Sequence, residues 1–130
     1  MKEVSIQFFA LMEYNIVMHE LEITQHILAD SIKEAQRHGA SAIKEIRLAI
    51  GPFSGFVPEC IQMYMDVLAE GTIAQGAVIR VREVPLRVLC RDCGQTAQID
   101  RAHIECPYCH GLNLKRLSGN ECMIESLEVD

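Results

Sequence analysis

The amino-acid sequence predicts an α/β fold, with two helices on a small three-stranded mixed sheet and a cysteine-bearing module inserted before the last strand. Three observations support this prediction. Two segments show the apolar periodicity of amphipathic helices, three segments alternate apolar and polar residues as strands do, and four cysteines form two closely spaced pairs between the second and third strands. Since helices and strands alternate before the cysteines, a layer of helices on a sheet is expected.

The first helix is expected over residues 20–38. Acidic residues in its first turn and Arg37 and His38 in its last turn match the helix dipole, and Gly39 supplies a left-handed residue after its end. The residues predicted to share its core-facing side are Leu21, Leu28, Ile32 and Ala35, with Ile27 beside them.

The strands and the second helix follow from alternation and from turn residues. Residues 46–50 alternate apolar and polar side chains, as a half-buried strand does. Pro58 suits the first position of a second helix, which ends before Gly71. The residues of its apolar stripe are Ile61, Tyr64, Met65 and Leu68. Residues 78–84 and 123–129 are predicted to form the second and third strands.

The chain is predicted to consist of two domains. The α/β body comprises residues 18–85 plus 120–130, and the cysteine module is an insertion of residues 86–119, because the turn Ser118-Gly119-Asn120 leads back to the last strand. Residues 1–17 are interpreted as an N-terminal extension. The favoured hypothesis is that translation of the native protein starts at Met18.

Composition and charge exclude several classes of function. The chain has 130 residues, 49% of them hydrophobic, and a formal net charge of −6, which disfavours a surface that binds nucleic-acid phosphates. No segment has the length needed to cross a bilayer, and residues 1–17 lack the features of a secretory signal. We therefore expect a cytoplasmic protein. No motif for acyl transfer, phosphate binding or hydride transfer occurs, so an enzyme is not expected.

The strongest signal is the sequence Cys90-Arg-Asp-Cys93, twelve further residues, and Cys106-Pro-Tyr-Cys109. Two Cys-x-x-Cys turns at this separation can place four thiolates at the corners of a tetrahedron, which is the arrangement that structural zinc prefers. Gly94 or Gly111 is expected to supply the unusual backbone angles of each turn. Because residues 86–119 contain few apolar side chains, the metal must hold this zinc ribbon together.

Other interpretations of the cysteines were weighed. Two disulfides would suit an oxidising compartment, and the four thiols could also merely pack. A thiol–disulfide oxidoreductase would need a reactive thiolate at the start of a helix. The Cys-x-x-Cys-His that ends at His110 is a weak haem-attachment pattern. The two remaining cysteines, Cys60 and Cys122, are interpreted as small buried hydrophobic residues.

The histidines give little information by themselves. His26, His38 and His103 are interpreted as surface residues. His19 precedes the first helix, and its imidazole suits nickel, copper or zinc, but a single histidine at this position is most often ordinary helix-entry chemistry. From the residues alone the role of His19 is open, as is that of Glu20, which is also a usual first-turn carboxylate.

Several motifs occur in a characteristic order between residues 18 and 130. They are Met18-His19-Glu20-Leu21, Ile46-Arg47-Leu48-Ala49-Ile50-Gly51, Ser54-Gly55-Phe56-Val57-Pro58-Glu59, Glu70-Gly71-Thr72, the paired Cys-x-x-Cys, and Ser118-Gly119 followed by Ser126-Leu127-Glu128-Val129. In this order and spacing the chain resembles the HypA/HybF family of hydrogenase maturation proteins.

The resemblance implies a nickel metallochaperone with two metal sites. Such a protein delivers Ni(II), its transferred cargo, to the large-subunit precursor of [NiFe]-hydrogenase and works with the GTPase HypB. It implies that His19 and the adjoining Glu20 bind nickel in the α/β body. It also implies that a structural Zn²⁺ is held by the four ribbon cysteines, Cys90, Cys93, Cys106 and Cys109.

One departure from the family concerns the start of the chain. Family members usually begin at the methionine of Met-His-Glu, so that the free amine and the first amide nitrogens can join the nickel coordination, whereas seventeen residues precede Met18 here. The competing hypothesis is a zinc-ribbon module that binds a protein or nucleic acid and has no nickel role. Nickel affinity that depends on His19 distinguishes the two hypotheses.

Overall fold

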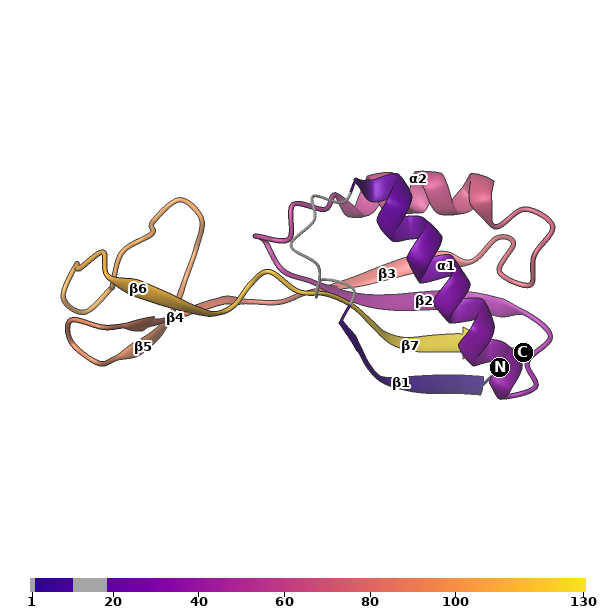
Figure 1. Ribbon diagram of the computed structural model, residues 1–130, viewed down its shortest axis with the longest axis horizontal. Coiled ribbons are helices and arrows are strands. Elements are labelled where there is room, and N and C mark those ends of the chain that lie inside the picture. Colours follow the sequence, from indigo (N-terminus) through magenta and orange to yellow (C-terminus); the bar gives the residue numbers. More distant parts are fainter. Residues whose placement is uncertain (1, 11–18) are drawn as a thin grey trace.

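The computed structural model describes residues 2–10 and 19–130. Figure 1 shows a broad α/β body from which a narrow ribbon extends. In chain order the elements are β1 (Lys2–Ala10), α1 (Glu20–Arg37), β2 (Ile43–Ile50), α2 (Pro58–Leu68), β3 (Val78–Glu83), β4 (Leu86–Cys90), β5 (Thr96–Ile99), β6 (Leu114–Ser118) and β7 (Cys122–Val129). The predicted class, α/β with an inserted cysteine module, is confirmed.

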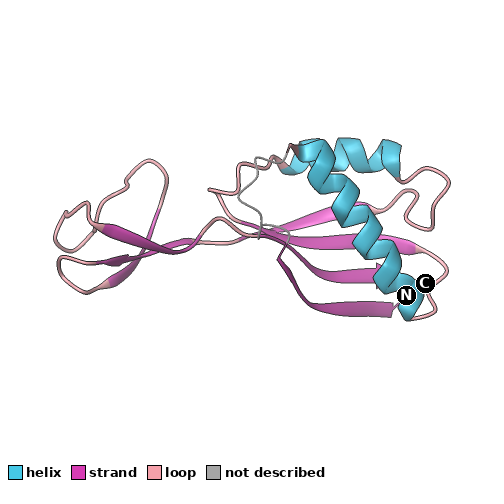
Figure 2. Ribbon diagram, viewed as in Figure 1, coloured by secondary structure: helices cyan, strands magenta, loops and turns pink. Residues whose placement is uncertain are grey.

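The body is built on a mixed sheet with the strand order β1-β7-β2-β3. Strand β7 is antiparallel to both of its neighbours, and β2 and β3 are parallel and are connected through α2. Helix α1 packs on β2 and β7, α2 packs on β3, and the two helices contact each other. The hydrophobic core fills the space between this helix layer, which Figure 2 shows in cyan, and the sheet.

The core-facing side of α1 differs in part from the predicted one. Ile27 and Ala35 are buried as expected, and Leu28 and Ile32 pack at the margin of the core. Leu21, however, is 39% exposed, and Ile23 occupies the buried position in the first turn. The prediction for Leu21 was wrong because a helical stripe is broad, and periodicity alone does not decide which of its margins faces the sheet.

The sheet has four strands rather than the three predicted, because residues of the N-terminal segment pair with β7. Strand β1 runs antiparallel along β7, with a change of register between Ser5 and Phe9. The Val4 side chain is 4% exposed and belongs to the core, and the Glu3 carboxylate lies 2.9 Å from the Arg47 guanidinium. Met18 and residues 11–17, which precede the first predicted helix, lie outside the described residues.

The second sheet, with the strand order β5-β4-β6, is antiparallel and is formed entirely by residues 86–118. The chain leaves the body after β3 and returns to it at β7, so the ribbon is joined to the body by two connections (Figure 1). In the described part of the chain, no helix is long and apolar enough to cross a membrane.

Candidate metal centre

The four ribbon cysteines converge at the end of the second sheet. The sulfur atoms of Cys90 and Cys109 lie 3.6 Å apart, as do those of Cys93 and Cys106. All four sulfur atoms lie within 4.8 Å of one another. Among the described residues this is the one cluster of three or more potential metal-ligating side chains that a single ion could contact.

The two turns that present the cysteines have the same backbone hydrogen bonds. In the first turn Cys90 N–H donates to the Gln95 carbonyl, and Gly94 N–H donates to the Cys90 carbonyl. In the second, Cys106 N–H donates to Gly111 and His110 N–H donates to Cys106. Each turn thus holds its two sulfur atoms on the same side of the chain.

The prediction of the residue with left-handed backbone angles was correct for the first turn only. Gly94 has a φ of 77°, whereas in the second turn it is His110, with a φ of 61°, that takes this conformation. A Cβ atom at Gly111 would lie 2.7 Å from a carboxylate oxygen of the exposed Asp92, a side chain that can turn away. The expectation that Gly111 takes the left-handed conformation was therefore wrong.

The sulfur geometry fits a tetrahedral zinc ion. With Zn–S bonds of about 2.3 Å, the sulfur atoms around tetrahedral zinc lie about 3.8 Å apart, close to the 3.6 Å of these two pairs. Cys90 and Cys106 are buried while Cys93 and Cys109 lie toward the solvent. Four sulfur ligands leave no open coordination position, so this site is suited to a structural role.

The pKa values of the thiols also fit binding of a cation. Hydrogen bonds from the backbone N–H groups of Cys109 and Tyr108, with those of neighbouring thiols, outweigh burial and lower the pKa of Cys106 to about 7. For Cys109 the backbone N–H of Gly111 lowers the pKa, but the Cys90 thiol, burial and the other thiols outweigh it and raise the pKa to about 12. Because neighbouring thiolates repel one another, full ionisation of the cluster requires a compensating positive charge, which Zn²⁺ supplies.

His19 stands at the N-terminus of α1, in the body. Its side chain is exposed and makes no capping hydrogen bond, while its carbonyl accepts the Ile23 N–H at 3.1 Å. The imidazole is therefore not used in helix capping, which the residues alone had favoured. His19 and Glu20 do not belong to a cluster of three potential metal ligands within the described residues.

Glu20 has a structural contact that sequence reasoning did not anticipate. Its Oε1 accepts a hydrogen bond from the backbone N–H of Val57 at 3.2 Å. Val57 is the residue immediately before α2, so this bond joins the starts of the two helices. A first-turn carboxylate is a weak signal by itself, and nothing in the sequence indicates that its partner is 37 residues away.

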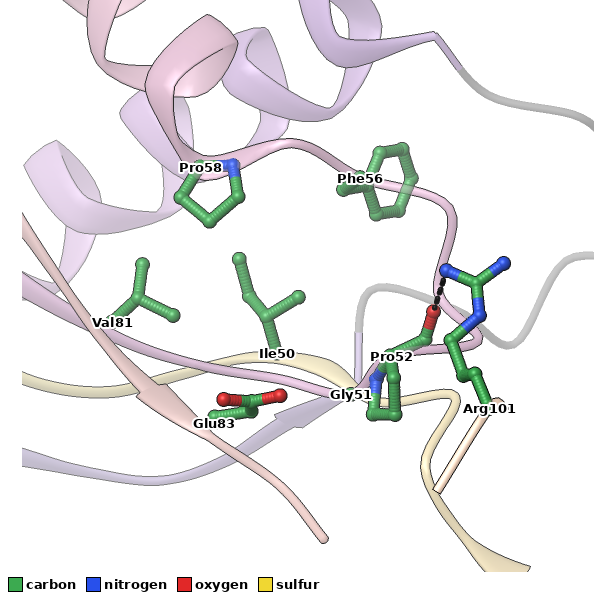
Figure 3. Close-up of a pocket in the computed structure, with 8 residues that line it drawn as sticks. All are labelled: Ile50, Gly51, Pro52, Phe56, Pro58, Val81, Glu83 and Arg101. Carbon is green, nitrogen blue, oxygen red and sulfur yellow. Dashed lines mark hydrogen bonds between the residues drawn. The ribbon is translucent and has the colours of Figure 1, made fainter. Parts of the chain in front are cut away.

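The segment before α2 borders a cleft of about 480 Å³ between the body and the ribbon. Its walls are largely apolar and include Ile50, Phe56 and Pro58, as Figure 3 shows. Arg101 reaches it from the ribbon and donates a hydrogen bond to the Pro52 carbonyl at 3.3 Å. The ribbon therefore contacts the body beside this cleft.

Cys122 and the three surface histidines lie where they were predicted, whereas Cys60 is less buried than predicted. Cys122 is buried on β7 and Cys60 is half-buried on α2. Burial raises the pKa of the Cys122 thiol to about 12. His26, His38 and His103 are exposed, and Nδ1 of His103 lies 3.2 Å from the Asp100 carboxylate.

Comparisons with known proteins agree with this arrangement. Residues 18–129 match the family model described as "Hydrogenase/urease nickel incorporation, metallochaperone, hypA". The chain is 38% identical over 113 residues to the hydrogenase maturation factor HypA of Dehalococcoides mccartyi, covering 87% of this chain and 95% of that protein. It is 34% identical over 112 residues to the factor of the same name from Paracoccus denitrificans, covering 86% and 99% of the two chains.

Solved structures show the same fold. A solution structure of a HypA protein aligns with a TM-score of 0.65 at 21% identity and covers 88% of this chain and 98% of its own. The solution structure of the nickel metallochaperone HypA from Helicobacter pylori aligns with a TM-score of 0.57, also at 21% identity, and covers 86% and 97%. With the four-cysteine cluster and the match over residues 18–129, the chain belongs to the HypA family of nickel metallochaperones for hydrogenase maturation.

Proposed function

We propose that this protein binds Ni(II) through His19 and Glu20 and delivers it to the large-subunit precursor of a [NiFe]-hydrogenase in the cytoplasm, with the GTPase HypB as its partner. The observation that carries the proposal is the family match, which begins at residue 18 and so includes the Met18-His19-Glu20 motif. The exposed imidazole of His19 supports it, because this side chain is not used in capping α1.

The two metals require sites of opposite character. A zinc ion enclosed by four thiolates exchanges slowly and is suited to hold the ribbon together. Nickel that is to be handed on needs few protein ligands and an accessible position, so that a partner can replace those ligands one at a time. His19, exposed at the start of α1, meets that requirement.

The role of the amine at Met18 depends on where the chain begins. In a chain that starts at Met1, the Met18 nitrogen is a peptide amide, and residues 2–10 are paired with β7. Nickel would then be bound through His19, peptide nitrogens and carboxylate oxygen only. A chain that starts at Met18 would add a free amine, a stronger ligand for Ni(II) in a square-planar arrangement.

The test is a calorimetric Ni(II) titration of zinc-loaded protein in four forms. These are the chain from Met1, the chain from Met18, and each of these with His19→Ala. His26→Ala in the chain from Met1 is the matched control, since His26 is an exposed histidine on the same helix. The proposal predicts binding of one Ni(II) that His19→Ala abolishes and His26→Ala leaves unchanged.

The titration also separates the alternatives. Tight binding by the Met18 form alone would show that the free amine is an essential ligand and that residues 1–17 block the site. Equal binding by both forms, lost with His19→Ala, would show that the amine is dispensable. Equally weak binding by every form would overturn the nickel assignment and favour the zinc-ribbon interaction module.

A further inference from the structure

The segment between β2 and α2, residues 51–57, contacts the ribbon at one end and α1 at the other. Near its start, the half-buried Phe53 faces two arginines of the ribbon. The guanidinium carbon of Arg101 lies 5.6 Å from the centre of the Phe53 ring, and that of Arg116 lies 5.7 Å from it. Both distances are within the range of cation–π attraction.

The two arginines come from different parts of the ribbon. Arg116 is on β6, and Arg101 follows β5 in the turn that contains the isolated Asp100–His103 bridge. Two guanidinium groups repel each other, but each is attracted by the electron-rich face of an aromatic ring. Because the two arginines come from different parts of the ribbon, their common contact with Phe53 depends on how the ribbon is folded and oriented.

Backbone contacts reinforce the joint. Phe53 N–H donates to the Gly119 carbonyl at 2.6 Å, and Arg101 donates to the carbonyl of the preceding Pro52 at 3.3 Å (Figure 3). Gly119 belongs to the connection through which the ribbon returns to β7. Residues 52 and 53 are therefore bonded both to the ribbon and to its connection.

The other end of the segment reaches the start of α1. Phe56 is buried in the core, and Val57 N–H donates to Glu20 Oε1 at 3.2 Å. Three residues thus separate Phe53, whose ring contacts the ribbon, from Val57, whose amide binds Glu20.

We propose that Phe53 is a positioning residue through which the folded zinc ribbon sets the orientation of the segment before α2 and, by way of Val57, of Glu20 at the start of α1. A change in the orientation of the ribbon then changes the position of Glu20, and a change at Glu20 affects the ribbon. The consequence for nickel rests on the proposed function, whereas the coupling itself is a property of the zinc-loaded protein without nickel.

The first experiment measures the orientation of the ribbon without nickel. Residual dipolar couplings of backbone amides are recorded for the zinc-loaded wild type, Phe53→Ala and Phe53→Tyr, the last of which keeps the ring. We expect β2, β7, β4 and β6 to share one alignment tensor in the wild type and in Phe53→Tyr. In Phe53→Ala the ribbon is expected to show a separate, smaller tensor, and the amide resonances of Val57 and Glu20 are expected to shift.

The double variant Arg101→Gln with Arg116→Gln removes both guanidinium groups from the Phe53 ring without changing a residue of the body. It replaces Phe53→Ala in this experiment if Phe53→Ala does not fold. It is expected to reproduce the loss of common alignment. The proposal is overturned if the ribbon keeps the wild-type tensor in these variants. It is also overturned if the ribbon reorients but the Val57 and Glu20 amides keep their wild-type shifts.

The second experiment titrates the same proteins with Ni(II). Phe53→Ala is expected to weaken binding roughly threefold to tenfold, as a modest coupling between two sites does, and Phe53→Tyr is expected to retain wild-type affinity. Unchanged affinity in Phe53→Ala would overturn the coupling to the nickel site. A wild type that binds no nickel would instead overturn the proposed function, and the orientation measurement would then decide the proposal by itself.

Discussion

Gly51 is the residue at which the segment before α2 comes closest to the returning connection of the ribbon. Its N–H donates to the Glu121 carbonyl at 2.9 Å. A Cβ atom at this position would lie 2.2 Å from the carbonyl carbon and oxygen of Gly119, a distance that no relaxation of a side chain can relieve. Only glycine allows the two backbones to approach in this way.

We expect Gly51→Ala to lower the free energy of unfolding by about 3 kcal/mol, because the backbones of two connected segments must separate. Gly55→Ala is the control, since Gly55 has a φ of 80° but open space around it, and its cost should be about 1 kcal/mol of backbone strain. Urea unfolding of the zinc-loaded proteins measures both. If Gly51→Ala lowered the free energy of unfolding by no more than Gly55→Ala does, the close approach of the two backbones at Gly51 would be contradicted.

The contribution of Glu20 to stability can be measured in the absence of nickel. Glu20→Ala removes the acceptor for the Val57 N–H and should lower the free energy of unfolding by about 1 kcal/mol, the usual effect of losing one hydrogen bond or cap. Glu22→Ala, another first-turn acidic residue of α1, loses only the helix-dipole interaction and should cost less. Thermal unfolding without nickel measures the difference, and equal costs would show that the Val57 bond adds no stability.

Cys122 is expected to make stability depend on pH in the alkaline range. Burial raises the pKa of its thiol from 9.0 to about 12, so between these values the folded protein keeps the proton that the unfolded chain releases. The unfolded state then binds fewer protons, and stability falls as pH rises, by up to about 1.4 kcal/mol per pH unit.

The measurement for Cys122 is urea unfolding at several pH values between 9 and 11. Cys122→Ala should remove this part of the slope. Other titrating groups affect both proteins alike, so the difference in slope isolates the buried thiol. Parallel slopes for the wild type and Cys122→Ala would contradict the raised pKa.

Among the secondary-structure elements, strand β1 gives the N-terminal segment a structural role in the body. It adds an antiparallel neighbour to β7, and it buries Val4 in the core. Without it, the backbone groups of β7 on that edge lose their partners in β1. The N-terminal segment therefore contributes both backbone pairing and a buried side chain to the body.

We expect Val4→Ala to lower the free energy of unfolding by about 2 kcal/mol, because a buried side chain loses two methyl groups and leaves a cavity. Lys2→Ala is the matched control on the same strand, where the side chain is exposed. A chain that starts at Met18 should lose at least as much as Val4→Ala. Urea unfolding compares the three with the wild type, and equal stability of all four proteins would contradict a structural role for β1.

At the scale of the whole molecule, body and ribbon depend on different forces. The cluster of buried residues that forms the main core lies entirely in the body. The ribbon buries few side chains besides its cysteines, among them Leu86, Val88 and Ala97. We therefore propose that residues 86–119 fold as a metal-dependent domain, and residues 18–85 plus 120–130 as one that is stable without metal.

Removal of zinc tests this division. After chelation we expect amide protons of β4 and β6 to lose their protection against hydrogen exchange, while those of β2 and β7 keep most of theirs. Exchange measured by NMR before and after chelation, and again after zinc is restored, gives the result. Loss of protection throughout the molecule would show that body and ribbon form one cooperative unit instead.

Local sequence patterns were sufficient to predict several elements of the fold. The helices, the strands β2, β3 and β7, and the cysteine turns all follow from periodicity, turn residues or ligand spacing, which are properties of short segments. The motifs between residues 18 and 130 were sufficient to indicate the family, which the family match over residues 18–129 confirms.

Contacts between residues far apart in the chain became evident only from the folded structure. The pairing of β1 with β7, the bond between Glu20 and Val57, and the convergence of two arginines on Phe53 join segments far apart in the chain. No local pattern distinguishes the residues that take part, because each contact depends on a partner far away in the sequence. Their positions follow from how the sheet and the ribbon pack, because packing brings together side chains that the order of the sequence keeps apart.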